Sequence, residues 1–214
     1  MTSTSDIRLI TPASPDYPHR LASGWVGSPS PELRTRGNIA LLDLPLVASF
    51  CSVKCPGNLI LQSHDLARRL REHHIPVVGG FHSPIEKEVL TVLLRGQSPL
   101  ITCPARSIGK MRIPAEQKAP LTEDRLLIVS PFKDYQKRAS KTTARYRNRV
   151  VAGLAEWVFI AYTDEGGSTE SLAREIITQG KPVYTFDSTY TANLIRLGAQ
   201  TVRLDEDSLA WEVG

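Results

Sequence analysis

Three short segments place glycine beside hydroxyl, basic or imidazole side chains, each at the expected start of a helix. They are CSVKCPG at residues 51–57, GGFHSPIE at 79–86 and DEGGSTES at 164–171. Glycine allows a backbone to approach a ligand closely, and the N–H groups at a helix N-terminus bind anions. The chemistry that the three segments share is therefore the binding of phosphate or of another anion.

The candidate ligands in these segments are their glycines and small polar or basic residues: Ser52, Lys54, Gly57, Gly79, Gly80, His82, Gly166, Gly167, Ser168 and Thr169. Each segment also has a purely structural interpretation. The first fits an ordinary turn, and His82 fits a hydrogen-bonded structural histidine. The third fits a capped loop with Ser168 as the helix cap. In the second, Ser83, Pro84 and Glu86 form the pattern of a capping box, which explains them without a ligand.

A fourth element, residues 133–149, is strongly basic. It holds seven Lys or Arg residues against one acid, a local charge of +6 in a chain whose net charge is +4. Such density indicates an anionic partner, phosphate or nucleic acid, although a solvated helix face is the alternative. The residues that we expect to bind are polar or basic: Lys133, Arg145, Arg147, Asn148 and Arg149.

The helical spacing within this basic segment assigns its residues to faces. Lys141, Arg145 and Arg149 recur every four residues and share one face, whereas Asn148 falls in line with apolar residues. We therefore expect Asn148 to be buried and to need a hydrogen-bonding partner. Two tyrosines among the bases, Tyr135 and Tyr146, have the chemistry to stack on nucleobases, or they pack against the core.

Catalytic and metal chemistries find no support in the residue spacing. The chain has no Ser–His–Asp or Cys–His arrangement and no metal quartet, so we expect a binding protein that is not an enzyme and requires no cofactor. Cys51, Cys55 and Cys103 are too few for a disulfide framework, and we interpret them as small buried thiols. No apolar run approaches the roughly 20 residues of a membrane span, and no signal pattern precedes residue 12. These features predict a cytoplasmic protein.

The elements that position these loops follow from composition and apolar runs. With 214 residues, 41% of them hydrophobic and 22% charged, the chain has an ordinary globular composition. Runs of consecutive apolar residues suit strands buried on both faces of a parallel sheet. They are Leu46–Phe50, Ile75–Val78, Pro99–Thr102, Leu126–Val129, Trp157–Ala161, Val183–Phe186 and Thr201–Leu204. Amphipathic stripes predict helices between them, around residues 59–70, 85–93, 145–149 and 172–177.

This alternation predicts an α/β fold: an extended Rossmann-like, mostly parallel open sheet with helices on both faces. We assign it to residues 44–214. Residues 1–43 are rich in Pro, Ser and Gly, and we expect them to form an irregular arm that packs on this core. In such sheets ligands bind beyond the carboxyl ends of the strands, which is where the glycine segments fall.

The segment RNRVVAGLA at residues 147–155 resembles the RNRxIAGLS segment of the DNA-processing protein A (DprA/Smf) family. GGSTES at 166–171 stands where the family has an SGSLxTA-like loop, and GKPV at 180–183 matches its G-[RK]-x-V strand. The stretch 17–37 resembles its YPxxL…PxxLxxRG entry. This resemblance covers about residues 15–187 and implies a Rossmann-like domain that binds single-stranded DNA and supports recombination or DNA uptake. It also implies a RecA-type recombinase as partner and self-association as a homodimer.

The chain departs from the family pattern in two loops. The family's GSR is CSVK here, and the first Ser and the Asp of its SGxAxGID loop are replaced. We therefore expect a compact, divergent relative. EGGSTE at 165–170 is more distantly similar to the PGGxGTxxE motif of LOG-type nucleoside monophosphate phosphoribohydrolases. That similarity implies the alternative functions, a small-nucleotide sensor or such a hydrolase, with a bound nucleotide or phosphate and Glu170 as the catalytic carboxylate.

Overall fold

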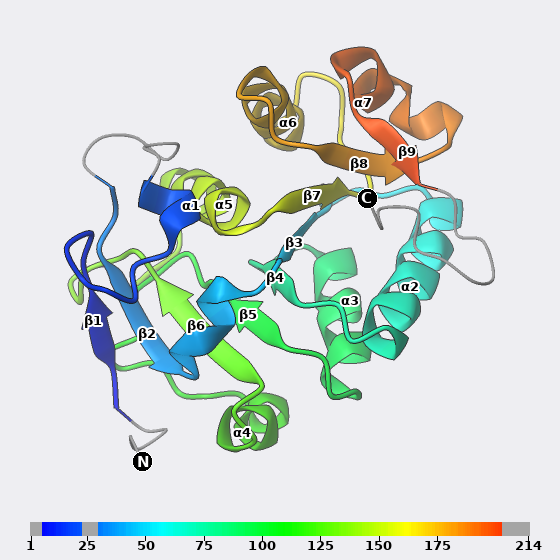
Figure 1. Cartoon of the computed structure of the whole chain (residues 1–214). Coiled ribbons are helices and arrows are strands. Elements are labelled where there is room, and N and C mark those ends of the chain that lie inside the picture. The colour runs from blue at the N-terminus through cyan, green and yellow to red at the C-terminus, as the bar shows by residue number, and fades with distance from the viewer. Residues whose placement is uncertain (1–5, 23–29, 203–214) are drawn as a thin grey trace.

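The computed structural model describes residues 6–22 and 30–202 of the chain (Figure 1). In chain order its helices and strands are β1 (Arg8–Ile10), α1 (His19–Ala22), β2 (Leu33–Gly37), η1 (Ile39–Asp43), β3 (Val47–Phe50), α2 (Gly57–Glu72), β4 (Val77–Gly79), α3 (Pro84–Leu94), β5 (Leu100–Thr102), α4 (Ala115–Thr122), β6 (Leu126–Ser130), α5 (Lys141–Leu154), β7 (Trp157–Ile160), α6 (Ser168–Thr178), β8 (Val183–Phe186), η2 (Thr189–Thr191), α7 (Ala192–Leu197) and β9 (Gln200–Val202). None of the helices described is long and apolar enough to cross a membrane.

The nine strands described form one sheet in the order β1-β2-β6-β5-β4-β3-β7-β8-β9. The seven strands from β6 to β9 in this order run parallel, and β1 and β2 are antiparallel at one edge. The predicted mostly parallel sheet is confirmed. The strand order reverses between β3 and β7, where Ala48 pairs with Val158. Such a reversal opens a crevice beyond the carboxyl ends of the two strands.

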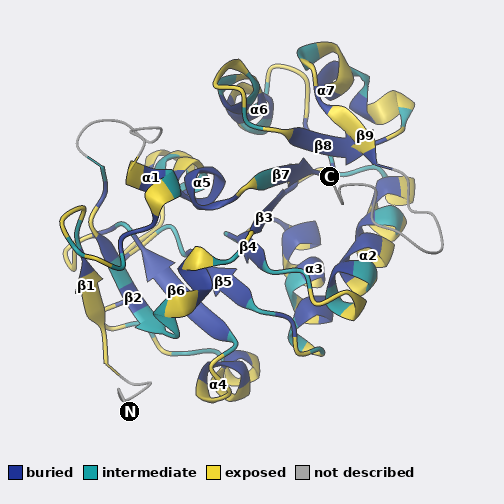
Figure 2. Cartoon of the chain, in the orientation of Figure 1, coloured by how far each residue is buried: buried dark blue, intermediate teal, exposed yellow. Residues whose placement is uncertain are grey.

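Helices cover both faces of the sheet, as predicted (Figures 1 and 2). One apolar cluster lies under α2, α3 and α4 and includes Leu66, Val89 and Leu121. The other lies under α1, α5, α6 and α7 and includes Leu21 and Val151. The central strands are buried on both sides, and most of their residues are apolar. The sheet is therefore a rigid frame whose carboxyl edge carries the loops.

The first 43 residues differ from the irregular arm that we expected. In the described part of this region, β1 and β2 extend the sheet, with Thr35 of β2 paired to Val129 of β6. Ile10, Leu21 and Leu33 are fully buried. The alternating burial of a short antiparallel strand, LRTRG in β2, leaves no consecutive apolar run to detect.

Several short elements were also absent from the prediction. Helix α4 contains Pro120 and has almost no apolar stripe, and α7 is only six residues long. Strand β9 begins one residue before the predicted run at Thr201, and the last two residues of that run, 203 and 204, lie outside the described residues.

Candidate functional site

The three glycine loops lie along one edge of the sheet, because they follow neighbouring parallel strands. β3 pairs with β4 on one side and with β7 on the other, so the loops after these strands leave in the same direction. The Ser52 backbone N–H donates to the Tyr162 carbonyl at 3.0 Å, which joins the first loop to the third. The structure thus brings the three predicted segments together at the point where the strand order reverses.

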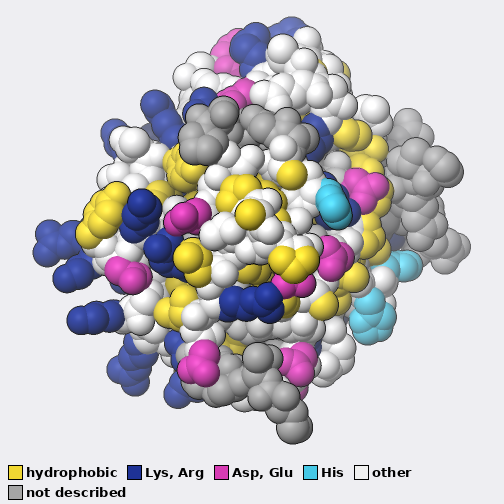
Figure 3. Space-filling view, turned by 60° about the vertical axis from the view of Figure 1, so that its left-hand side comes forward, with side chains coloured by type: hydrophobic (Ala, Val, Ile, Leu, Met, Phe, Trp, Pro, Cys, Tyr) yellow, Lys and Arg dark blue, Asp and Glu magenta, His cyan; other side chains and the backbone are white. Residues whose placement is uncertain are grey.

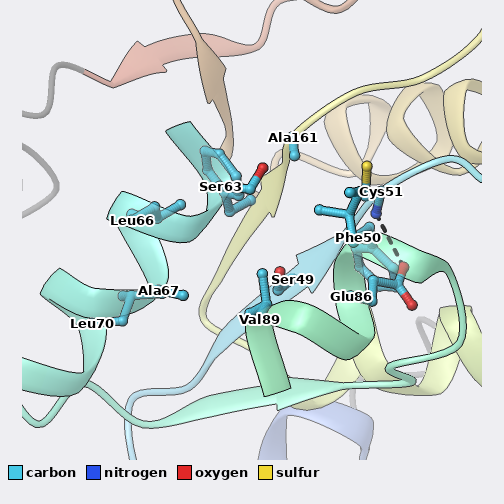
Figure 4. Close-up of a pocket in the computed structure, with 12 residues that line it drawn as sticks. Ser49, Phe50, Cys51, Ser63, Leu66, Ala67, Leu70, Glu86, Val89 and Ala161 are labelled. Atoms are coloured by element: carbon cyan, nitrogen blue, oxygen red, sulfur yellow. Dashed lines mark hydrogen bonds between the residues drawn. The ribbon is translucent and has the colours of Figure 1, made fainter. Parts of the chain in front are cut away.

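Glu86 ties the second loop to the first. The predicted capping box is present: the Ser83 hydroxyl accepts from the Glu86 N–H at 3.2 Å. The buried Glu86 carboxylate also accepts from the N–H groups of His82, at 2.7 Å, and Cys51, at 3.0 Å. Figure 4 shows this second bond beside a cavity of about 10 Å³, room for one water-sized molecule. Sequence reasoning assigned Glu86 only a local role, because its link to Cys51 spans 35 residues.

The double glycine at 79 and 80 makes room for the protein's own side chains. A Cβ on Gly79 would lie 2.7 Å from the Phe81 ring, and one on Gly80 would lie 1.5 Å from Nη1 of Arg147. Phe81 itself has a positive φ of 47° and is buried. The close approach that the glycines suggested is therefore made to these two residues. His82 is exposed, and its backbone N–H is bound by Glu86.

Arg147 is buried, with 3% of its surface exposed, where we expected a phosphate-binding residue on the surface. Its guanidinium donates from Nη1 to the Cys103 carbonyl at 2.8 Å and from Nε to Asn148 Oδ1 at 2.8 Å. Within the described residues it forms no ion pair. Burial raises the pKa of Cys103 to about 12, and the Arg147 charge opposes that shift. The arginine thus fastens α5 to the loops after β4 and β5.

Asn148 also differs from its expected position, which was inside the protein. It is half-buried, not buried, and its side chain accepts from Arg147. Helix spacing assigned the inward position to the wrong residue of this pair. The Arg147 side chain is long enough to carry its charge from α5 to the edge of the sheet, which a helical projection cannot represent.

A groove of about 440 Å³ lies between α5 and α6 and collects several predicted residues. It is lined by Arg145, Asn148 and Arg149 from α5 and by Ser168 from the start of α6. Arg149 pairs with Glu175 of α6 at 3.0 Å, whereas Arg145 is exposed and forms no ion pair with another described residue. Lys54 and Lys133 are also exposed, on the loops after β3 and β6. Figure 3 draws one face of the molecule, and Lys and Arg side chains gather along its left-hand edge.

Two tyrosines accompany these bases. Tyr146 lines the groove and packs edge-on against Phe132, with ring centroids 5.9 Å apart and an interplanar angle of 64°. Burial raises its pKa. Tyr135 is 79% exposed in the loop between β6 and α5. One tyrosine thus forms part of a wall, and the other presents a free ring face to solvent.

The third loop is held by Glu170. This buried carboxylate accepts from the Gly166 N–H at 2.6 Å and from the Asn193 side chain at 3.1 Å, so both of its oxygens have partners. The helix cap is Gly167, and α6 has no side-chain cap hydrogen bond, so the interpretation of Ser168 as the cap was wrong. Ser168 is the first residue of α6, followed by Thr169, and it is exposed to the groove.

Helix α2 also begins without a side-chain cap. Its N-cap is Pro56, its first turn holds no acidic residue, and a Cβ on Gly57 would meet nothing within 4 Å. By contrast, α3 and α5 both start with complete capping boxes. The positive end of a helix dipole attracts anions. The helices that follow β3 and β7 therefore begin at the strand reversal without side-chain caps.

The cysteines need one correction. Cys51 and Cys103 are buried as expected, but Cys55 is half-buried beside Pro56. Across the described residues no group of three or more His, Cys, Asp or Glu side chains is arranged to hold a metal ion.

Residues 8–211 match the family model described as DNA recombination-mediator protein A. This chain belongs to that family. The finding confirms the resemblance to DNA-processing protein A that its RNR segment indicated. A comparison with curated protein sequences finds no match.

Solved structures of this family share the fold. DNA processing protein A from Streptococcus pneumoniae is 19% identical with a TM-score of 0.75, over 93% of this chain and 72% of that one. DNA processing protein A from Helicobacter pylori, described for its mode of binding single-stranded DNA, is 21% identical with a TM-score of 0.73, over 92% and 90%. A molybdenum cofactor binding protein from Rippkaea orientalis, 10% identical, is similar with a TM-score of 0.53, over 75% and 90%.

In this member of the DNA recombination-mediator protein A family, the RNR segment has three distinct environments. Arg147 is buried under Gly80, Asn148 is half-buried beside it, and Arg149 is paired with Glu175 across the groove. Lys181 has a structural role. In the sequence it was noted only as part of the GKPV segment, which matches the family pattern. Its Nζ donates to the Ala152 carbonyl at 2.6 Å and closes the C-terminal end of α5.

Proposed function

We propose that this protein binds single-stranded DNA along the carboxyl edge of its sheet, without catalysis. The observation that carries the proposal is the groove between α5 and α6, where Arg145, Arg149 and Ser168 meet beside an uncapped helix start. Family membership supports it, as does the description of the Helicobacter pylori protein as a single-stranded DNA binder.

The contacts that we propose follow from the chemistry of the strand. Exposed Lys54, Lys133 and Arg145 neutralise phosphates, and the N–H groups at the starts of α2 and α6 hold phosphate oxygens. Bases stack on Tyr135, which adds affinity with little sequence preference. Arg147, Gly79, Gly80 and Glu86 act behind this surface by fixing the loops that bear it.

We extend the proposal to the expected biology: support of recombination or DNA uptake, a RecA-type recombinase as partner, a homodimer and a cytoplasmic location. The family's description as a recombination mediator supports the first of these, and the others stay predictions. Binding is favoured over nucleotide hydrolysis because both oxygens of Glu170 are occupied inside the protein. A bound nucleotide or phosphate would occupy the same helix starts, as a fragment of the strand.

The test is fluorescence anisotropy of a labelled single-stranded oligonucleotide over a range of salt concentrations, with duplex DNA and AMP as separate competitors. We expect binding that weakens as salt increases, and we expect duplex DNA and AMP to be poor competitors of the labelled strand. Arg145→Ala should weaken binding and reduce the slope of log affinity against log salt by about one. Arg68→Ala is the matched control, because Arg68 is half-exposed near the far end of α2 and pairs with Glu72.

Two results would overturn the proposal. One is the absence of binding at tens of micromolar protein and low salt, where even non-specific electrostatic association is expected. The other is an equal effect of the two arginine variants. Release of ribose phosphate from AMP that is lost in Glu170→Gln would instead establish the hydrolase alternative.

A further inference from the structure

Two cysteines bracket the loop between β3 and α2. Cys51 follows the last residue of β3, and Cys55 directly precedes Pro56, the N-cap of α2. Both residues contact the same apolar cluster, Cys51 as a member and Cys55 packed against it. The Cys51 and Cys55 side chains also interact with each other, and each has the largest influence on the pKa of the other, so the two thiols lie close together at the base of the loop.

The two thiols have different environments. The interaction with the Cys51 side chain lowers the pKa of Cys55, which also lies at the positive end of α2, where the first turn holds no acidic residue. The same interaction with Cys55, together with burial and the nearby Glu86 charge, raises the pKa of Cys51. Cys55 is half-buried and Cys51 is buried. Cys55 is therefore the thiol that solvent reaches and that ionises first.

The backbone of the loop allows the sulfur atoms to come together. Cys51 is fixed, because its N–H donates to Glu86 and the Ser52 N–H donates to Tyr162. Residues 53–55 make no backbone hydrogen bond to another described residue, and Val53 and Lys54 are exposed. A disulfide needs the sulfurs about 2 Å apart. Residues 53–55, which lack such backbone hydrogen bonds, can move so that the Cys55 sulfur approaches Cys51 while Cys51 stays in place.

We propose that Cys51 and Cys55 form a modification site, an intramolecular disulfide made by peroxide and reversed by thiol reductants. The Cys55 thiolate attacks a peroxide oxygen, an S–O bond forms, the O–O bond breaks, and the other oxygen leaves as alcohol or water after taking up a proton. Cys51 sulfur then attacks Cys55 sulfur, the S–S bond forms, and the hydroxyl leaves as water with the Cys51 proton. The two thiols lose two electrons in total, and the peroxide gains them.

The regulatory consequence rests on the proposed function. Ser52 and Lys54 lie inside the ring that the disulfide closes, and Gly57 begins the helix next to it. Moving these groups should remove one phosphate contact or two, so oxidation should weaken binding of single-stranded DNA by about fivefold at low salt. Transient disulfides of this sensing type occur even in reducing compartments.

The experiment treats the full chain with hydrogen peroxide, alkylates it under denaturing conditions and maps the peptides by mass spectrometry. We expect the loss of two hydrogens, a peptide linking Cys51 to Cys55, and one thiol still alkylated, the fully buried Cys103. Cys103→Ala should oxidise in the same way. Cys51→Ala should instead leave a sulfenic acid on Cys55 that dimedone traps. Three alkylated thiols after peroxide, or a link between two chains, would overturn the proposal.

Anisotropy on the oxidised and reduced protein separates the two proposals. If the linked peptide forms but neither state binds the oligonucleotide, the modification stands and the proposed function fails. If the reduced protein binds and no linked peptide forms, the modification fails and the proposed function stands. If the linked peptide forms and binding is unchanged, the regulatory consequence is wrong.

Discussion

The loops after β3 and β4 leave adjacent strands and both combine glycine with polar residues, yet the protein uses them in opposite ways. The β4–α3 loop is closed: Ser83 caps the helix, Glu86 binds the His82 N–H, and Arg147 fills the space beside Gly80. The β3–α2 loop is open: its helix starts at Pro56 with no side-chain cap, and Lys54 is exposed. A glycine loop is thus a candidate ligand site only where the protein leaves its donors unused.

The third loop lies between these two cases. Its Gly166 and Gly167 N–H groups are taken by Glu170 and by the Asp164 carbonyl, so they resemble the closed loop. Its helix start is open like that of α2, because Gly167 gives α6 no side-chain cap and Ser168 faces the groove. The anion-binding capacity of this loop therefore lies in the first turn of α6 and not in the glycines that drew attention to it.

The largest effect that we predict is the loss of stability caused by a substitution in the closed β4–α3 loop. In Gly80→Ala the new methyl group would lie 1.5 Å from Arg147 Nη1, so the buried guanidinium must leave its site on the Cys103 carbonyl. We expect a loss of about 3 kcal/mol or more in the free energy of unfolding, from overpacking and a lost buried hydrogen bond. Urea unfolding of the variant measures it.

Gly57→Ala is the matched control in the open loop. Its Cβ would meet nothing within 4 Å, at the first position of α2. We expect its stability to stay within about 0.5 kcal/mol of the unaltered protein, as for substitutions in open space. Equal stability of the two alanine variants would show that the loops do not differ as described.

A smaller effect is expected when the two loops are compared by their contribution to DNA affinity. Lys54→Ala removes an exposed charge from the open loop, and we expect it to weaken binding of single-stranded DNA by about three- to tenfold at low salt. His82→Ala removes an exposed side chain from the closed loop. The His82 backbone N–H already donates to Glu86, so we expect the affinity to stay unchanged. Anisotropy titrations of the two variants measure this contrast. A larger loss in His82→Ala would move the binding surface to the β4–α3 loop.

The sequence predicted the central sheet well because its strands are buried on both faces and appear as consecutive apolar runs. Strand β6, LLIVS, is entirely buried and was predicted almost to the residue. The antiparallel strands β1 and β2 were missed because neither has a run of buried apolar residues: β2 only alternates in burial over five positions, and β1 is three residues long with Ile10 alone buried.

The site was harder to predict because its contacts join residues far apart in the chain. The glycines, the basic segment and their common edge of the sheet were identified from residue type and position alone. The burial of Arg147 in place of Asn148 was not, because it depends on a carbonyl 44 residues away and on the missing Cβ of Gly80. Periodicity assigns a helix face, but it does not tell how far a long side chain reaches along that face.

The last prediction concerns the far end of α5, which is closed in the way that the β4–α3 loop is closed. Lys181 donates to the carbonyls of Ala152 and Ala155, and burial lowers its pKa to about 8 from an ordinary value of 10.5. Between those two pH values the unfolded chain holds this proton more tightly than the folded protein. The free energy of unfolding should therefore rise with pH across this window, by less than about 1.4 kcal/mol per unit, because one proton is involved.

The measurement compares urea unfolding of the unaltered protein and of Lys181→Met at pH 7, 8, 9 and 10. Below pH 8 the lysine is charged in both states, so the difference between the two proteins should be constant there. Above pH 8 the unaltered protein should gain stability relative to Lys181→Met, while exposed Lys87→Met should follow the unaltered protein throughout. A difference that stays constant up to pH 10 would mean that Lys181 closes the helix with an ammonium group that keeps its ordinary pKa. The closed end of α5 would then depend on a charged lysine throughout this range.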